Sequence, residues 1–409
     1  MLNGEIHNWY RFRLGFSDHL VADLLTEFGA SGKSRVLDPF CGTGTVLVES
    51  MKQGFDCIGI DANPASFFAA QVKTTWNLNS AHVLDLLDEV ESSLPYPRSL
   101  SRLTADPCFG YLDDAGFLKR GWIGLEALFE ALAIKHAIQN LRTTGKYRRL
   151  LLLALVASVI EDGSNLKFGP ELYCSKRSTP PDVLGGFLDR VETMAFDLRT
   201  FGSVPAGSAG VILGDSRDCS SLLKKKKAFD IVICSPPYPA EHDYTRNTRM
   251  ELALLGHVTN RASLRSIKGT MIRSHTKGIY SDDNDRQYVQ GNRRIERLVK
   301  QIQCAVSGKT YGFARLYPRV VQEYFGGIVR HLRNLRKKLA TDAMCAYIVG
   351  DQSSYFGVPI PTARLLAHLA ELNGYSVVEI RYWRHRWSTS TSRQIDENIL
   401  ILRPSAKTS

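Results

Sequence analysis

The sequence predicts an α/β protein whose mostly parallel sheet is interrupted by insertions, and two observations support this class. First, Arg35–Asp38 has the pattern of a buried strand, followed by a glycine-rich turn, a helix over 45–53 and a second strand at 55–60. Such β-α-β units build parallel sheets with right-handed crossovers. Second, strand patterns return at 210–213 and 229–234, beyond a middle region with helical spacing.

The other elements follow from hydrophobic periodicity and turn residues. We expect a first helix within the segment 9–28, where Phe16, Leu20 and Leu24 have helical spacing and Ser17 or Asp18 could cap it. The remaining expected elements are helices over 122–141, 147–161, 320–339 and 361–373, a strand over 343–349, and a C-terminal hairpin of strands 375–382 and 398–402.

Composition narrows the class of protein. Hydrophobic residues make up 44% of the chain and charged residues 23%, which is ordinary for a globular protein with a core. The net charge of +11 favours a polyanionic partner such as nucleic acid, although a basic solvated surface gives the same excess. The apolar run 150–160 is too short for a bilayer, which needs about 20 residues. We therefore expect no membrane association. The eight cysteines include no C-x-x-C pair, so we expect reduced thiols in a cytoplasmic protein and no metal site.

The glycine-rich turn is the first candidate site. Its residues are Asp38, Pro39, Phe40, Cys41, Gly42, Thr43, Gly44 and Thr45. The two glycines allow a tight turn and a close approach to a ligand, and the following helix presents free N–H groups. Asp61 ends the next strand, where a carboxylate can accept hydrogen bonds from ribose hydroxyls. These residues indicate a nucleoside-bearing cofactor, and a tight turn without a ligand is the alternative. The G-x-G-x-x-G pattern typical of NAD sites is incomplete.

These residues resemble a known family. Asp38-Pro-Phe-Cys-Gly-Thr-Gly-Thr45 is similar to the cofactor motif of the amino-methyltransferases that act on DNA, and Gly59-Ile-Asp-Ala-Asn-Pro64 is similar to their next motif. The resemblance implies a class I methyltransferase fold, Rossmann-like with a C-terminal antiparallel hairpin, and S-adenosyl-L-methionine as the cofactor. It also implies cofactor contacts from Asp61, Ala62 and Asn63. Residues 9–25 resemble the helix that these enzymes place over the methionine part of the cofactor.

Ser235-Pro-Pro-Tyr238, directly after the strand 230–234, is the candidate catalytic motif. Pro236 and Pro237 end the strand and fix a turn at its carboxyl end, where ligands bind in open α/β sheets. The amino nitrogen of cytosine or adenine is a poor nucleophile because its lone pair is delocalised. Ser235 Oγ and the Pro236 carbonyl could accept the amino hydrogens, and Tyr238 could stack on a flipped base. A proline turn that ends an edge strand is the alternative.

The tetrapeptide resembles the catalytic motif of the same family, in which Asp, Asn or Ser precedes Pro-Pro and an aromatic residue. The Ser form implies cytosine as the target and N4-methylcytosine as the product, and adenine remains open. The resemblance also implies that Asp215, with Ser216, contacts the adenine part of the cofactor, while a helix cap is the alternative. We interpret Cys234 as a buried small residue, not as the nucleophile that carbon-5 methylation of cytosine requires.

The motif order resembles the arrangement that is called alpha in this family. It predicts that residues 1–80 carry the cofactor motifs and that the largely helical insertion 81–205 is a candidate target-recognition domain. Residues 206–409 would complete the methyltransferase domain, with a basic insertion at about 242–310. Asp215 lies after the helical insertion, beside the catalytic motif, so which segment recognises the DNA is left open.

Two basic segments are candidates for contacts with DNA. The first follows the catalytic turn, and the second, 381–387, alternates cations with aromatic residues. The candidate residues are Arg246, Arg249, Lys268, Arg273, Lys277, Arg384 and Arg386. A solvated surface is the alternative for both segments.

The sequence therefore predicts a site-specific DNA methyltransferase of a restriction-modification system, or a solitary one. Its partners would be DNA and a cognate restriction endonuclease or other defence-system proteins. Three alternatives remain open at this point. They are an N6-adenine DNA methyltransferase, an RNA methyltransferase that acts on guanine amino groups, and an inactive homologue that only binds nucleic acid.

Overall fold

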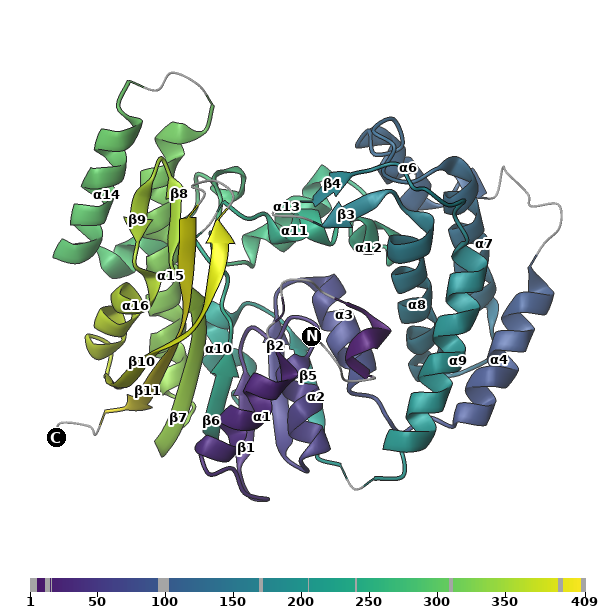
Figure 1. The fold of residues 1–409 in the computed structure, drawn as a ribbon, viewed down its shortest axis with the longest axis horizontal. Coiled ribbons are helices and arrows are strands. Elements are labelled where there is room, and N and C mark those ends of the chain that lie inside the picture. Colours follow the sequence, from purple (N-terminus) through teal and green to yellow (C-terminus); the bar gives the residue numbers. More distant parts are fainter. Residues whose placement is uncertain are drawn as a thin grey trace.

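The computed structural model describes residues 6–11, 15, 17–94, 103–168, 172–204, 206–239, 241–308, 312–388 and 393–405, without side-chain detail at 352–355, 386–388 and 393. Within these residues a seven-stranded sheet has the order β10-β11-β7-β6-β1-β2-β5 (Figure 1). Its strands are β1 (Arg35–Asp38), β2 (Asp56–Asp61), β5 (Ala209–Leu213), β6 (Phe229–Cys234), β7 (Leu339–Gly350), β10 (Tyr375–Ser388) and β11 (Arg393–Pro404).

The strand directions confirm the predicted α/β class. β1 pairs in parallel with β2 on one side and with β6 on the other. β5 extends the parallel part beyond β2, and β7 extends it beyond β6. β11 runs antiparallel between β7 and β10, so the expected C-terminal hairpin is also confirmed. The strand order reverses at β1, and ligands of open α/β sheets bind at such a switch point, beyond the carboxyl ends of the strands.

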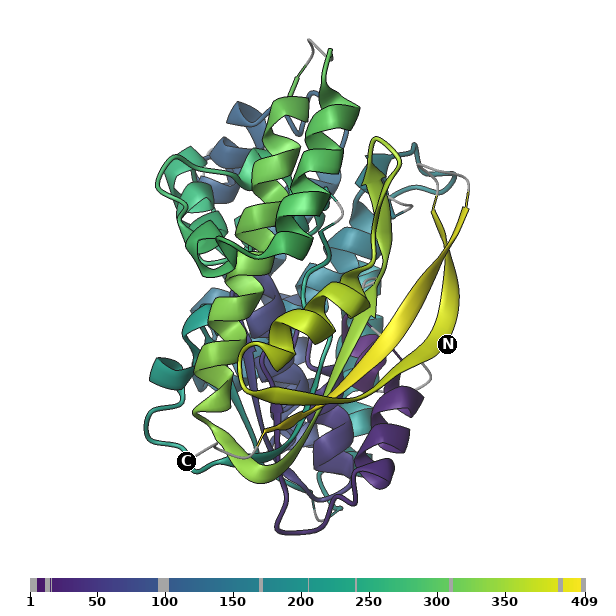
Figure 2. The same cartoon turned by 90° about the vertical axis from the view of Figure 1, so that its left-hand side faces the viewer.

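Helices cover both faces of the sheet (Figure 2). Ile231 and Ile233 of β6 face one hydrophobic core, and Val232 and Cys234 face the other, as strand geometry requires. The first core includes side chains from α1 (Asp18–Glu27), α2 (Thr45–Lys52) and α3 (Pro64–Lys73). The second includes side chains from α10 (Cys219–Leu222), α14 (Arg293–Val306), α15 (Tyr317–Arg336) and α16 (Thr362–Glu371).

The chain between α3 and β5 is largely helical and lies beside the sheet, on the right in Figure 1. Its elements are α4 (Ser80–Ser93), α6 (Pro107–Asp114), α7 (Leu125–Asn140), α8 (Gly145–Ser158), the π-helical turn η2 (Val159–Gly163), the hairpin of β3 (Leu166–Phe168) and β4 (Leu172–Cys174), and α9 (Val183–Phe201). These helices belong to the same hydrophobic core as α1, α2 and α3. The insertion therefore packs as a continuation of one face of the sheet. None of the helices described is long and apolar enough to cross a membrane.

Short helices follow the Ser235–Tyr238 turn. α11 (Tyr244–Asn247), α12 (Arg249–Leu254) and α13 (Arg261–Gly269) lie between the sheet and the helical insertion (Figure 1). The 3-10 turns η4 (Thr276–Gly278) and η5 (Asp285–Val289) come next, and η5 packs against α15 at Gly326. The other elements are η1 (Ile6–Trp9), η3 (Ser216–Asp218), η6 (Ala314–Leu316), β8 (Gln352–Tyr355) and β9 (Val358–Ile360).

Within the segment 9–28 the expected helix is α1, which begins at Asp18 with Ser17 at the N-cap position, although no side chain caps it. Trp9 lies before this helix, at the end of the 3-10 turn η1. The buried side chains at the start of the chain have partners in other elements. Trp9 Nε1 donates to Asp197 of α9 at 2.7 Å, and the Tyr10 hydroxyl donates to Glu251 of α12 at 2.6 Å.

One glycine in α15 allows a close approach between helices, which makes it a test of the fold. A Cβ at Gly326 would lie on the carbonyl oxygen of Asp285 in η5. We expect Gly326→Ala to lower the free energy of unfolding by about 1–3 kcal/mol, because the backbone of η5 must shift.

Gly110 in α6 is the matched control, since a Cβ there meets no heavy atom within 4 Å. We expect Gly110→Ala to raise the free energy of unfolding by about 0.5–1 kcal/mol. Urea denaturation of both variants measures the difference. Equal effects of the two substitutions would contradict the packing described for α15.

Candidate functional site

The glycine-rich turn leaves β1 at its carboxyl end and begins α2. Gly42 and Gly44 have φ of 51° and 90°, left-handed conformations that glycine adopts without strain. A Cβ at Gly42 would meet no heavy atom within 4 Å, so open space lies above the turn. Gly44 is the N-cap residue of α2, and no side chain caps this helix. The start of α2 thus presents backbone N–H groups and the positive end of its dipole, which suits a polar ligand.

The side chain of Asp61, at the end of β2, points towards the glycine-rich turn. Its Oδ2 accepts from the Gly42 N–H at 2.8 Å and its Oδ1 accepts from the Asn63 N–H at 2.7 Å. Burial raises the pKa of Asp61 to about 6, although the two N–H groups lower it. Asp38 is also buried, and its Oδ1 accepts from the Phe40 N–H at 2.9 Å. A carboxylate held in this way keeps lone pairs for ribose hydroxyls, so the donor set fits a nucleoside cofactor.

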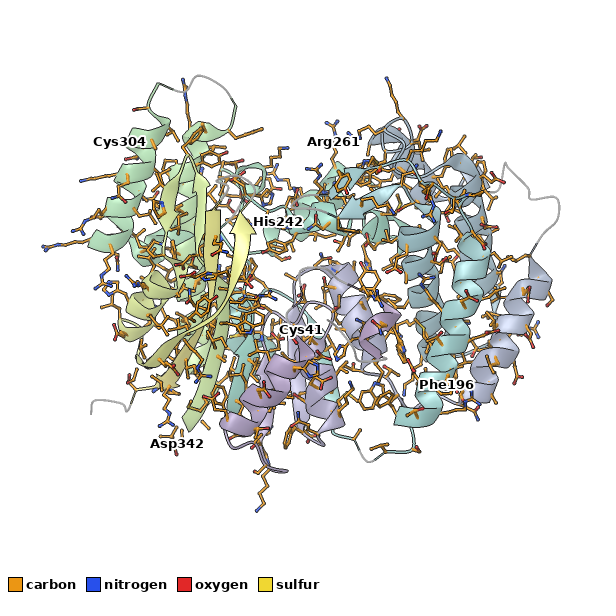
Figure 3. The ribbon with its side chains drawn as sticks, in the orientation of Figure 1. Cys41, Phe196, His242, Arg261, Cys304 and Asp342 are labelled. Carbon is orange, nitrogen blue, oxygen red and sulfur yellow. The ribbon has the colours of Figure 1, made fainter. Side chains whose placement is uncertain are left out.

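Other predicted cofactor residues surround the same turn. Cys41 and Thr43 are buried, and Figure 3 labels Cys41 near the centre of the molecule. Asn63 caps α3 with its Oδ1, and its Nδ2 donates to Thr248 Oγ1 at 2.9 Å. The amide of Asn63 therefore connects the end of β2 to the segment that follows the catalytic motif.

Asp215 and Ser216 follow β5 and close the other side of the turn. The hydroxyl of Ser216 donates to the Pro39 carbonyl, and its side chain is buried. Asp215 caps η3 and forms an ion pair with Arg217 at 2.6 Å. Arg217 also pairs with Asp285 of η5, so a buried ionic network supports the loop after β5.

The Ser235–Tyr238 turn lies directly beside the glycine-rich turn because β6 pairs with β1, with Leu37 opposite Val232. Ser235 Oγ and the Tyr238 hydroxyl are 3.4 Å apart, so both polar groups lie on the same side of the turn. The Pro237 carbonyl accepts from the Tyr324 hydroxyl at 2.8 Å, and the Tyr238 N–H donates to the Tyr244 hydroxyl at 3.0 Å. Cys234 is fully buried, as expected for a small core residue.

The basic residues proposed to contact DNA fall into two groups. Lys268 is buried and pairs with Asp243 at 2.6 Å, and Arg273 is buried and pairs with Asp283 at 2.6 Å. Burial alone would raise the pKa of Asp243, but Lys268 and His275 hold it well below its usual range. Both cations thus stabilise the loop that follows the catalytic motif, and neither faces solvent.

The other basic candidates are more accessible. Arg246 and Lys277 are exposed, and Arg246 donates to the Leu172 carbonyl of β4 at 3.2 Å. Arg249 is half-buried and donates to the Tyr111 hydroxyl of α6 at 3.3 Å. Exposed Arg384 pairs with Glu397. The side chain of Arg386 lies outside the described residues.

Sequence reasoning missed the groups that hold the catalytic turn. Tyr244 lies within the segment considered for DNA binding, and only its arginine neighbours were singled out. Tyr324 begins the stretch Tyr324-Phe-Gly-Gly, which resembles a later family motif, but nothing in the pattern indicates that its hydroxyl reaches Pro237. No pattern in the sequence indicates the role of Arg217.

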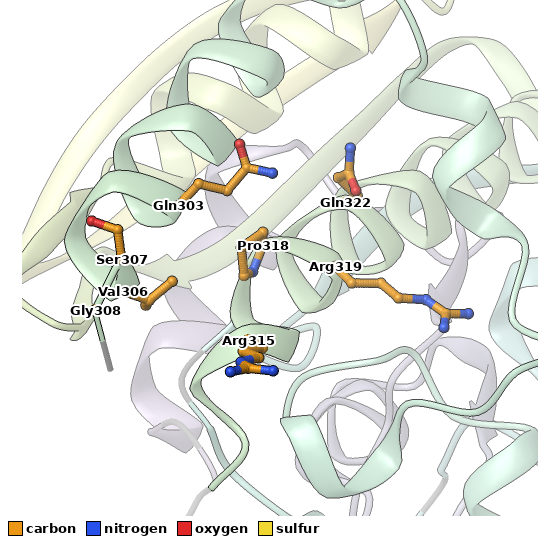
Figure 4. A pocket seen from close by; sticks show the side chains of 8 residues that line it. All are labelled: Gln303, Val306, Ser307, Gly308, Arg315, Pro318, Arg319 and Gln322. Carbon is orange, nitrogen blue, oxygen red and sulfur yellow. The ribbon is translucent and has the colours of Figure 1, made fainter. Parts of the chain in front are cut away.

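Two further features lie away from these turns. His7, Asp18 and Glu49 bring potential metal ligands within 4.8 Å of one another. Glu49 Oε1 there already interacts with His7 at 2.7 Å and Lys52 at 2.9 Å, so the cluster is explained as an ion pair. A pocket of about 480 Å³ between α14 and α15 is lined by Arg315, Arg319 and their neighbours (Figure 4). It includes none of the residues predicted for cofactor binding or catalysis.

Comparisons with known proteins agree with this geometry. The RMKL-like methyltransferase domain matches residues 14–93, which contain the glycine-rich turn and Asp61. The Type II methyltransferase M.BsoBI of Geobacillus stearothermophilus is 25% identical over 98% of this chain and 85% of its own. M.AvaI of Nostoc sp. is 23% identical over 91% of this chain and 80% of its own. Among solved structures, an rRNA methyltransferase from Streptomyces viridochromogenes covers 95% of this chain and 85% of its own, with 12% identity and a TM-score of 0.36, which is too low to bear on fold or function.

The fold, the glycine-rich turn with Asp61 and the matches to the methyltransferase domain and to the two Type II methyltransferases define an S-adenosylmethionine-dependent methyltransferase. Within that class the chain is similar over nearly its whole length to the Type II methyltransferases.

The ionic network beside the cofactor turn yields a stability prediction. The side chains of Arg217 and Asp285 are 7% and 8% exposed, so removing the cation deprives buried Asp285 of its closest partner and leaves it only the 3.2 Å pair with Arg330. We expect Arg217→Met to lower the free energy of unfolding by about 3–5 kcal/mol.

Arg381 is the matched control because it also pairs with two carboxylates, those of Glu27 and Glu379, but at the surface. Arg381→Met should cost less than about 1 kcal/mol. Thermal and urea unfolding compare the two variants. A small cost at Arg217 would show that the network adds little to the stability of the site.

Proposed function

We propose that this protein is a DNA methyltransferase that transfers the methyl group of S-adenosylmethionine to the exocyclic amino group of a flipped cytosine, giving N4-methylcytosine. The observation that carries the proposal is the adjacency of two turns. The Ser235–Tyr238 turn leaves β6 beside the glycine-rich turn that leaves β1, so a base and a cofactor bound there would meet. The similarity to Type II methyltransferases supports DNA as the substrate and a cognate restriction endonuclease as a partner.

When bound, the cofactor supplies a methyl group on a positively charged sulfur. The residues of the chain then act by position. Ser235 Oγ and the Pro236 carbonyl accept the two amino hydrogens and direct the nitrogen lone pair out of the ring, and Tyr238 stacks on the base. No covalent bond to the protein is needed. Both acceptors only hold the amino hydrogens by hydrogen bonds, and the proton that the methylated nitrogen loses passes to solvent. Because Ser235 carries a hydroxyl in place of a carboxylate, the amino group is bound by a neutral acceptor.

We propose that DNA lies over the segment 241–280, between the sheet and the helical insertion. Arg246 and Lys277 expose cationic side chains that can approach phosphates, and Arg384 lies on the C-terminal hairpin. The insertion 81–205 is the candidate target-recognition domain. This assignment is supported by hydrogen bonds between the insertion and the segment after the catalytic motif. Arg246 donates to the Leu172 carbonyl, and Arg249 donates to the Tyr111 hydroxyl.

Mass spectrometry of nucleosides tests the proposal, after DNA and RNA are incubated separately with the protein and isotope-labelled S-adenosylmethionine. Label on N4-methylcytosine from DNA is the expected result. Label on N6-methyladenine would keep the mechanism and correct the target base. Label only in RNA, or in neither nucleic acid, would refute the proposed substrate.

Ser235 and Tyr238 should affect the chemical step more than cofactor binding. We expect Ser235→Ala and Tyr238→Ala each to lower kcat by about 100-fold or more, because a positioned acceptor or the stacking ring is lost. The Kd of S-adenosylmethionine, measured by calorimetry, should change by less than about threefold.

Ser220→Ala is the matched control for the serine. It also removes a hydroxyl that forms a hydrogen bond, at 2.8 Å to Asn334, but on α10. Normal kcat in this control and in both site variants would exclude the proposed mechanism.

Asp61 should make cofactor binding depend on pH. Its pKa is raised to about 6 by burial, and the ionised form is the better acceptor for ribose hydroxyls. Affinity should therefore be nearly full at about pH 7 and above, where the carboxylate is ionised, and fall by up to about tenfold per pH unit below about pH 6, as the carboxylate becomes protonated. Titration calorimetry from pH 5 to pH 8 measures this dependence.

Asp61→Asn should weaken binding at pH 8 by about tenfold or more and flatten the pH profile, since the charged acceptor is gone. Asp56→Asn, at the exposed start of the same strand, is the control. It should leave the affinity for S-adenosylmethionine and its pH dependence unchanged. A wild-type affinity that is constant from pH 5 to pH 8 would remove Asp61 from the ribose site.

A further inference from the structure

One peptide group in the catalytic turn is held from both ends. Its carbonyl, that of Pro237, accepts from the Tyr324 hydroxyl at 2.8 Å. Its N–H, that of Tyr238, donates to the Tyr244 hydroxyl at 3.0 Å. The carbonyl and the N–H belong to the same planar unit, since a peptide bond resists rotation by about 18–20 kcal/mol. Two phenols from different helices therefore fix one peptide plane.

Both phenols are anchored independently of the turn. Tyr324 is fully buried in α15, within the hydrophobic core on one face of the sheet. Tyr244 is the first residue of α11, whose N-cap Asp243 accepts from the Thr245 and Arg246 N–H groups. Asp243 is itself paired with Lys268 at 2.6 Å. A shift of the peptide plane would thus have to displace α15 or the Asp243–Lys268 pair.

The plane controls the groups that are proposed to hold the base. The Pro236 carbonyl belongs to the preceding peptide, and only φ and ψ of Pro237 separate the two planes. The pyrrolidine ring fixes φ at about −65°, which leaves ψ of Pro237 as the soft dihedral. The two hydroxyls restrain that ψ. They thereby restrain the direction of the Pro236 carbonyl and the position of the Tyr238 backbone.

The hydrogen-bond directions are fixed as well. Burial raises the pKa of Tyr324 well above its ordinary value, and the nearby Tyr244 and Tyr238 raise it further. Tyr324 therefore stays protonated and remains the donor to Pro237 at any pH at which the protein works.

We propose that Tyr324 and Tyr244 are positioning residues for methyl transfer, which orient the Pro236 carbonyl and Tyr238 by clamping the peptide between Pro237 and Tyr238. The role in catalysis rests on the proposed function, whereas the clamp itself does not. The two parts need separate measurements.

Hydrogen exchange tests the clamp without any substrate. Pro236, Pro237 and Pro239 have no N–H, so in a peptic fragment that covers 235–240 the Tyr238 amide is nearly the only internal reporter. We expect slow exchange in the wild type. Tyr244→Phe should speed exchange at Tyr238 by about tenfold or more, and so should Tyr324→Phe, although Tyr324 is not the acceptor of that N–H. Unchanged exchange in Tyr324→Phe would overturn the clamp.

Tyr375→Phe is the matched control. Tyr375 is also buried, and its hydroxyl donates at 2.8 Å to a backbone carbonyl of α15, that of Leu332, instead of to the peptide between Pro237 and Tyr238. It should lower stability about as much as Tyr324→Phe and leave exchange at Tyr238 unchanged. Faster exchange at Tyr238 in this control would mean that general loosening of α15 explains the effect.

Kinetics on DNA test the positioning role. We expect Tyr324→Phe and Tyr244→Phe each to lower kcat by about tenfold or more per folded enzyme, with the KM values for DNA and S-adenosylmethionine within about twofold of wild type. The kcat of the double variant should be little below that of the less active single variant, because both hydroxyls hold the same peptide plane. Unchanged kcat, or effects that multiply, would overturn the role.

The two failures can be told apart. A wild type that methylates no DNA refutes the proposed function, and the exchange measurement still decides the clamp. An active wild type with faster exchange but normal kcat in the variants refutes the positioning role alone.

Discussion

The parallel pairing of β1 with β6 is the constraint on which the site depends. Parallel strands present their carboxyl ends at the same edge of a sheet, so the two turns that leave β1 and β6 emerge side by side. The pairing is reinforced where the strands begin, because the Arg35 N–H donates to Asp230 at 2.9 Å and the Arg35 guanidinium donates to the Ala228 carbonyl at 2.6 Å. A slip of one residue would exchange the side chains that face the two cores, and the packing of Ile231 and Ile233 in one core and of Val232 and Cys234 in the other opposes such a slip.

The turns at this edge are also connected to one another by polar side chains. Ser216 connects the loop after β5 to the turn after β1, and Asp61 connects the end of β2 to the same turn. Asn63 reaches Thr248 and so connects β2 to the segment that follows the catalytic motif. Four loops from four strands thus form a single hydrogen-bonded unit. Preorganisation of this kind means that little reorganisation is needed when charge develops during the reaction.

Local patterns in the sequence were enough to predict the elements that carry the motifs. β6 has the expected bounds, and α2 and α16 end within two residues of the expected positions, because apolar periodicity and turn residues determine such elements locally. The partners of the polar side chains could not be predicted in the same way. Lys268 and Arg273 look like phosphate ligands in a basic stretch, yet each is buried against an aspartate. Trp9 and Tyr10 lie before the first helix, and their partners are Asp197 and Glu251. Partners so distant in the sequence are set by the tertiary fold, which no local periodicity encodes.

The placement of β1 at the centre of the sheet has a consequence for the order of events during synthesis. β1 is made early, but its partner across the switch point follows 195 residues later, as the contact of Arg35 with Asp230 shows. At about 5–20 residues per second, a ribosome needs roughly 10–40 s to supply it. During that interval one side of β1 has no strand to pair with, and apolar Val36 and Leu37 have only part of their final surroundings. Apolar side chains around β1 therefore stay incompletely covered during that interval, and their exposure would lengthen wherever translation pauses before β6.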